Sequence, residues 1–346
     1  MTELAVAPKL APSPERAFAS PPRFRLGRQS LLLTGFGLLA LVAAAGVLGW
    51  DLPGAPGSAG RDLAVQLRLV SVATIVVVAT CQGVGTVLFH TITGNRILTP
   101  SIMGFEAIYV VMQTALVFFF GGAMLANTDG LAKIAIQSLL MIGVTTALFT
   151  WLFTYRRASL HVTLLIGVVL GIGLGSLSTF MQRLLTPSDF DLLRARLFGN
   201  LSNSNPAYLP YAAGLAALLV ALVWTRRHHL DVLALGPAVA TSLGLNYRRE
   251  VTGVLIIVSA LMSISTALVG PLAFLGFIVA TLTYQLSGSG QHRVTLPLVV
   301  VLGTAVLLSG YFILRHVFYA AGLLSVIIEF IGGLTFLVFL LRKGVL

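Results

Sequence analysis

Apolar residues occur along this chain in long uninterrupted runs, and short polar segments between the runs hold most of the charges. A helical run of about 20 apolar residues matches the hydrocarbon thickness of a bilayer, roughly 30 Å. The pattern therefore predicts ten membrane-spanning helices. They cover residues 30–50, 69–89, 101–120, 134–154, 162–181, 207–224, 251–269, 270–286, 296–314 and 323–341.

The amino-acid composition is typical of a protein that is surrounded by lipid. The chain is 57% hydrophobic and 10% charged, with a mean hydropathy of +0.96, whereas soluble domains are about 25% charged. We expect an all-α polytopic membrane domain over residues 30–346, with bilayer lipids around it. Residues 1–29 are polar and Pro-rich, so they predict a disordered cytoplasmic tail, with no cleavable signal peptide.

The excess of basic residues has a topological explanation. The chain has 22 Lys and Arg against 11 Asp and Glu, a net charge of +11. These residues form short clusters between the apolar runs, and no basic face with aromatic residues is present for nucleic acid. With both termini in the cytoplasm, ten crossings place 15 of the 22 basic residues on the inner side, as the positive-inside rule requires.

Motifs for catalysis, metals or nucleotides are missing from the sequence. Cys81 is the only cysteine, the six histidines lack ligand spacing, and no Walker motif occurs. Gly167, Gly171 and Gly175 share one helix face, where small residues let two helices approach closely. We therefore expect no enzyme activity, no cofactor and no metal site.

One predicted inward loop, residues 225–250, is too long for a simple connector. Its sequence indicates two short helices, over 231–235 and 238–243, separated by Gly236-Pro237. Such a pair makes a docking surface beneath the membrane. The pattern alone is equally compatible with an interfacial helix that has no partner.

The segment LALGPAVATSLGLN in this loop resembles the coupling loop of the FecCD-type permeases, which import iron siderophores, haem and cobalamin. Residues 94–121 and 270–297 resemble two further characteristic segments of that family. The resemblance implies a type II ABC importer permease in the bacterial inner membrane. It assigns contact with the ATPase to six loop residues. These are Leu235, Gly236, Pro237, Ala240, Leu243 and Gly244, with Pro237 at a position that is usually acidic in the family.

The resemblance also implies the partners. ATP hydrolysis belongs to separate ATPase subunits, substrate arrives on a binding protein, and a second permease copy or a paralogue completes the pore. The particular residues in these motifs favour a ferric siderophore as substrate, with haem or cobalamin as alternatives. An ion-driven secondary carrier is the main rival from another class, and the absence of an intramembrane His/Asp/Glu cluster disfavours a membrane enzyme.

Two arginines at the predicted outer side, Arg68 and Arg315, match family arginines that bind acidic residues of the binding protein, and a further family arginine is Ser71 here. Guanidinium groups suit this task because they bind carboxylates with two hydrogen bonds. Snorkelling to the membrane interface is the alternative explanation for both. The outer segment 187–206 predicts a short helix across the entrance.

The remaining candidates concern the gate and the path. Asn95, Leu98 and Pro100 lie in the inner turn that the family places near its cytoplasmic gate, although an ordinary Gly-Asn turn is the alternative. Glu106 and Glu329 are the acids inside predicted spans. Because an acid in hydrocarbon costs several kcal/mol, each is expected to line the path or to bond a neighbouring helix.

Overall fold

A computed structural model of the protein describes residues 26–55, 57–122, 131–155, 160–197, 206–319 and 324–343. Within these ranges the regular structure is entirely helical, as predicted. The elements are α1 (Leu26–Gly49), α2 (Ala59–Thr93), α3 (Phe105–Phe120), α5 (Leu131–Tyr155), α6 (Leu160–Arg183), α7 (Pro187–Leu197), α8 (Leu209–Thr225), α9 (Arg227–Leu233), α10 (Pro237–Ser242), α11 (Tyr247–Val269), α12 (Leu275–Ser287), α13 (His292–His316) and α14 (Leu324–Lys343).

Each of the ten predicted spans contains a helix, but their lengths differ. Six described helices, α1, α2, α5, α6, α11 and α13, are long and apolar enough to cross a membrane. A seventh crossing needs α8 together with α9, which is bent from it by 65°. The helices α3, α12 and α14 are shorter apolar helices. Residues 1–25 of the predicted tail lie outside the described residues, and α1 begins at Leu26, earlier than residue 30.

The short helices follow sharp interruptions in the chain. Gly94 ends α2 with φ +61°, and Gly270 ends α11 with φ +95° and is followed by Pro271. The 13 residues of α12 rise only about 20 Å, less than the thickness of the hydrocarbon core. Its first turn therefore begins within the depth of the membrane, where its backbone groups need partners from the protein.

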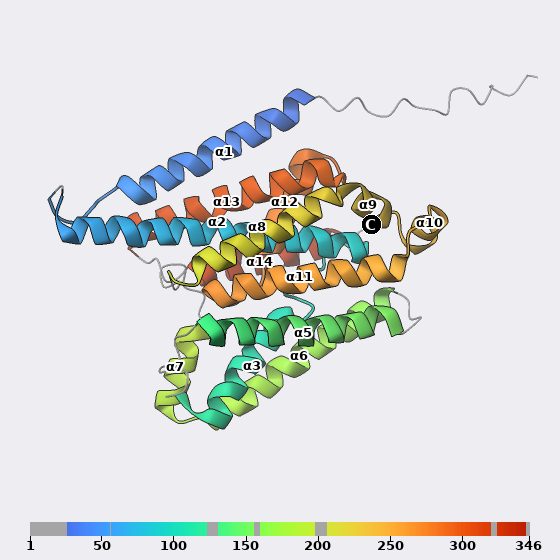
Figure 1. Ribbon diagram of the computed structural model, residues 1–346, viewed down its shortest axis with the longest axis horizontal. Helices are drawn as coiled ribbons and strands as arrows, with labels where there is room; N and C mark the ends of the chain where they lie inside the picture. The colour runs from blue at the N-terminus through green and yellow to red at the C-terminus, as the bar shows by residue number, and fades with distance from the viewer. Residues whose placement is uncertain are drawn as a thin grey trace, which may run out of the picture.

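The helix α2 occupies the centre of the bundle and packs against α11, α12 and α13 (Figure 1). Close approach to α13 depends on two glycines. A β-carbon on Gly83 would lie 3.0 Å from Val299, and one on Gly303 would lie 3.1 Å from Val279 and 3.5 Å from Ala79. Little side-chain volume therefore separates the backbones of α2 and α13 at these two points.

The helices α3 and α6 form a second close contact. The backbones of Gly104 and Gly171 meet there, and a β-carbon on Gly171 would lie 3.2 Å from the α-carbon of Gly104. Gly167 faces Met103, whereas Gly175 has open space around it. The predicted small-residue face is thus confirmed at two of its three glycines.

The loop helices mark the two ends of the bundle. The helices α9 and α10 lie at one end, and α7 lies across the opposite end (Figure 1). We call these the coupling end and the entrance end, after the coupling loop and the entrance helix that the sequence predicts there. Both α2 and α13 run between them, in opposite directions.

Replacing Gly171 with leucine should destabilise the protein, because the new side chain meets the backbone of Gly104 and overpacking costs roughly 1–3 kcal/mol. The matched control is Gly175→Leu, which adds the same side chain into open space on the same helix. Thermal unfolding of the purified variants in detergent measures the difference. Equal melting temperatures for the two variants would contradict the packing described for α3 and α6.

Candidate functional site

The predicted pair of short helices in the 225–250 loop is present as α9 and α10. The first begins earlier than predicted, at Arg227, and ends at Leu233. Gly236 separates the helices with φ +91°, and Gly244 follows the second with φ +87°. Both glycines therefore hold left-handed backbone conformations that other residues rarely adopt.

Three exposed apolar residues lie on α10 and in the turns on either side of it, at the coupling end. Leu235, Val239 and Leu243 are 59%, 45% and 61% exposed, and we refer to these three residues as the apolar patch. Ala240 points the other way and is fully buried, so it fixes α10 against the rest of the loop. Pro237 occupies the first position of α10, where its missing N–H has no cost.

Three further residues join the coupling loop to the bundle, and no sequence motif indicated them. Asp231 of α9 accepts hydrogen bonds from the backbone N–H of His292 (2.8 Å) and lies 2.6 Å from its Nδ1 atom. The Nε2 atom of His292 lies 2.7 Å from the hydroxyl of Thr91 in α2. The sequence separates Thr91 from His292 by 201 positions, so only the fold could reveal this contact.

The two candidate docking arginines lie close together at the entrance end, where α1, α2 and α13 meet. The guanidinium of Arg68 is buried and donates to the carbonyls of Val47 (3.0 Å), Trp50 and Asp51 (2.8 Å). Arg68 thus satisfies carbonyl groups at the end of α1 that would otherwise lack partners. Arg315 is half-buried and donates to the hydroxyl of Tyr311 (2.6 Å).

Arg68→Gln should lower the thermal stability of the protein, because three carbonyls at the end of α1 would lose a charged donor. Hydrogen bonds to charged groups contribute about 1.5–3 kcal/mol. Arg315→Gln is the control and should have a smaller effect, since Arg315 donates to a single hydroxyl group, that of the buried Tyr311. Thermal unfolding tests the ranking, and a larger loss for Arg315→Gln would contradict the capping role.

Glu106 is buried where two interrupted elements meet. Its Oε1 atom accepts from the hydroxyl of Ser101 (2.8 Å) and from the backbone N–H of Leu272 (3.1 Å), just before α12. Close by in the core, Gln82 of α2 donates to Ser265 of α11 at 3.1 Å. Glu106 therefore bonds a neighbouring chain segment, which is one of the two roles expected for it.

The inner turn between α2 and α3 is ordered by its own polar groups. The side chain of Asn95 accepts from the N–H of Ile97 at 2.9 Å, and the carbonyl of the buried Pro100 accepts from the N–H of Phe105 at 3.2 Å. Leu98 packs against the core. Arg96 lies over the ring of Tyr284, 4.4 Å from its centroid, and links the turn to α12.

Glu329 has a different environment from Glu106. Its side chain is exposed on α14, beside Phe330, which is 72% exposed. A carboxylate directed at lipid tails is strongly unfavourable. This face of α14 therefore needs water or another polypeptide against it.

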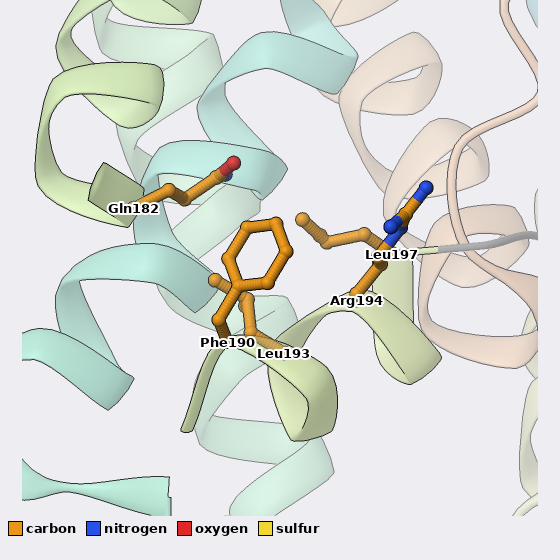
Figure 2. Close-up of a pocket in the computed structure, with 5 residues that line it drawn as sticks. All are labelled: Gln182, Phe190, Leu193, Arg194 and Leu197. Carbon is orange, nitrogen blue, oxygen red and sulfur yellow. The ribbon is translucent and has the colours of Figure 1, made fainter. Parts of the chain in front are cut away.

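A short helix was predicted in the segment 187–206, and α7 is present over Pro187–Leu197. Residues 198–205 of that segment lie outside the described residues. Asp189 fastens α7 to the end of α3 by accepting from the N–H of Gly122 at 3.0 Å. A pocket of about 390 Å³ lies between α7 and the end of α6. Phe190 and Gln182 are among the side chains that line it (Figure 2). Gln182 donates to Thr114 (3.1 Å) and Ser178 (2.9 Å), which ties α3 to α6 beneath the pocket.

Apolar helices of membrane-spanning length, with polar contacts between the interrupted ones, define a polytopic membrane protein. Comparison with known proteins gives the family. The profile of the FecCD transport family matches residues 28–342. The chain belongs to the FecCD transport family, whose permease subunits are transport components and leave ATP hydrolysis to a separate subunit.

Two relatives and one solved structure agree with this assignment. The chain is 42% identical to the petrobactin import system permease protein FatC of Bacillus anthracis, over 89% of this chain and 87% of that protein. It is 36% identical to the petrobactin import system permease protein YclO of Bacillus subtilis, over 82% of this chain and 90% of that protein. An inward-facing metal-chelate type ABC transporter has the same fold, with a TM-score of 0.75 and 23% identity over 91% of this chain and 99% of that one.

Proposed function

We propose that this chain is the permease of an ABC importer that moves a ferric siderophore of the petrobactin class across the bacterial cytoplasmic membrane. The observation that carries the substrate class is the identity of 42% and 36% with two petrobactin permeases over more than four fifths of the chain. Haem and cobalamin are the weaker alternatives within the family. The chain itself performs no covalent chemistry, so tight ligand groups along the path are unnecessary.

The ATPase subunit docks on the coupling loop. The apolar patch has three large exposed side chains, one on α10 and one in the turn on either side of it, a feature that a partner or a membrane surface would cover. Leu230 and Leu233 of α9 are buried in the bundle, so the loop has one face for the bundle and one for the partner. A groove on the ATPase that accepts α10 gives helix-in-groove binding.

The coupling end faces the cytoplasm in this proposal, and both termini lie on that side. Paired arginines flank the coupling loop, at Arg226-Arg227 and Arg248-Arg249, and Arg96 and Arg293 lie at the same end of the bundle. This concentration of positive charge agrees with the positive-inside rule.

Replacing both Leu235 and Leu243 with aspartate should abolish co-purification of the ATPase subunit, because two charges would have to be buried in an apolar contact. The matched control is His229→Asp, at an exposed polar position on α9. Affinity purification of the tagged permease from cells that also produce the ATPase measures this. Retention of the ATPase by the double variant would show that α9 and α10 are interfacial helices without that partner.

The binding protein docks at the entrance end. Arg315 is the better placed of the two arginines, because the guanidinium of Arg68 is occupied by the end of α1 in this conformation. Acidic residues on the binding protein would complement the positive charge of the pair. Asn95, Leu98 and Pro100 remain our proposed gate residues, at the opposite end of the path.

Charge reversal at Arg315 should weaken binding of the substrate-loaded binding protein by about tenfold or more, since an attraction becomes a repulsion. Arg183→Glu is the control, because it makes the same charge change at the end of α6 on the same side. Titration of the binding protein onto the detergent-solubilised complex gives both affinities. An unchanged affinity for Arg315→Glu would overturn docking at this site.

A second permease, either another copy or a paralogue, completes the path. The exposed Glu329 supports this proposal, because a water-lined path between two subunits would remove its contact with lipid. In this arrangement Glu106 stabilises the packing of the helices that surround the translocation path. Glu329 lines or faces the path.

Measurement of siderophore uptake by cells tests the substrate assignment directly. Cells that lack this permease should lose accumulation of labelled ferric petrobactin and regain it when the chain is restored, whereas uptake of haem and cobalamin should be unaffected. Unchanged ferric petrobactin uptake would overturn the substrate assignment. Loss of haem or cobalamin uptake instead would favour the alternative substrate.

A further inference from the structure

A chain of polar contacts, buried at His292 and Thr91, joins the coupling loop to two long helices. Its first contact is between Asp231 of α9 and His292, the first residue of α13, at 2.6 Å from carboxylate to Nδ1. Its second is between His292 Nε2 and the Thr91 hydroxyl of α2, at 2.7 Å. His292 is 2% exposed and Thr91 is 8% exposed, whereas the side chain of Asp231 is 31% exposed. The contact between His292 and Thr91 is therefore the one best shielded from water.

Asp231 also completes the start of α13. The first N–H groups of a helix have no partner within it, and the N-cap residue Gln291 makes no side-chain hydrogen bond. Asp231 accepts from the N–H of His292 at 2.8 Å. A carboxylate at a helix N-terminus is further stabilised by the helix dipole, so α9 supplies the cap that the sequence of α13 lacks.

These polar contacts fix the register between α9 and the bundle. The apolar side chains of α9, Leu230 and Leu233, are also buried, but hydrophobic contact is non-directional and permits sliding. Hydrogen bonds of 2.6 to 2.8 Å require particular atoms to stay opposite one another. A displacement of α9 is therefore passed to α2 and α13 at this point.

The same two helices reach the entrance end. Arg68 lies in α2 and Arg315 lies in α13, at the ends remote from Thr91 and His292. Close packing at Gly83 and Gly303 joins the two helices between these ends. The pair thus connects the proposed docking site of the binding protein with the proposed docking site of the ATPase.

We propose that Asp231, His292 and Thr91 are positioning residues that link the coupling loop to the α2–α13 pair, so that ATP hydrolysis and binding-protein docking are transmitted between the two ends of the permease. This inference rests on the proposed function, because it assumes that the ATPase binds the α9–α10 loop. The proposal gives these three residues a positioning role and no part in binding the siderophore or ATP.

The order Asp, His, Thr is also that of a nucleophilic triad, but the environment does not suit a nucleophile. The hydroxyl of Thr91 donates to the carbonyl of Val87 at 2.9 Å. Three pockets among the described residues, one between α6 and α7 and two along α5 and α11, are lined by other side chains. The geometry points instead to a role in transmitting movement between the coupling loop and the α2–α13 pair.

A pair of substitutions at Thr91 separates this role from simple packing. Thr91→Val keeps the shape and removes the hydroxyl, whereas Thr91→Ser keeps the hydroxyl and removes a methyl group. The assembled importer, reconstituted with its ATPase and supplied with loaded binding protein, gives the amount of ferric petrobactin transported per ATP hydrolysed. Thr80 of α2 provides the control, because its hydroxyl donates within its own helix, to Val76.

We expect Thr91→Val to assemble with the ATPase and to reduce transport per ATP by about fivefold or more, the scale of a typical coupling free energy. Thr91→Ser and Thr80→Val should stay near the wild-type ratio, and Asp231→Asn and His292→Gln should behave like Thr91→Val. A wild-type ratio in Thr91→Val, or a greater loss in Thr91→Ser than in Thr91→Val, would overturn the inference. Failure of the wild-type chain to assemble with an ATPase would instead overturn the proposed function.

Discussion

The main constraint on this fold is that backbone groups inside a bilayer need hydrogen-bond partners within the protein. The chain interrupts its helices twice inside the bundle, after α2 and after α11. Glu106 meets this need for one such group by accepting a hydrogen bond from the backbone N–H of Leu272, just before α12. It also accepts from the hydroxyl of Ser101, in the loop before α3. A carboxylate that is expensive in hydrocarbon is therefore retained where it joins two broken elements.

Close glycine contacts have a related consequence. They bring α2 against α13, and α3 against α6, with little side-chain volume between the backbones. Within membranes, where lipid tails are as apolar as leucine, such packing is a main source of helix association. Rigid pairs of this kind let a movement at the coupling end reach the entrance end without being absorbed in between.

The hydrophobic pattern predicted the helices well because span length is set by the bilayer. All ten runs contain a helix, and the two loop helices around Gly236 were expected from local turn chemistry. The lengths of α3 and α12 were less predictable, since Gly94 and Gly270 end the preceding helices in positive-φ conformations. Residues 101–104 and 270–274 continue each apolar run without belonging to the helix.

Side-chain roles were harder to predict because they depend on the partners that the fold supplies. Arg68 matches a family position for docking, yet its guanidinium is bonded to the end of α1. Asp231 and His292 carried no motif, because a carboxylate in one loop and a histidine at the start of a span become a pair only after folding. Glu106 and Glu329 looked alike in sequence and differ in burial.

The account depends on energy that reaches the permease from a separate ATPase. Proteoliposomes that contain the permease, with or without the ATPase, allow ferric petrobactin uptake to be measured under ATP or under an ion gradient. Uptake should require both the ATPase and ATP, and the permease alone should remain inactive under the gradient. Gradient-driven uptake by the permease alone would identify a secondary carrier and contradict the central claim.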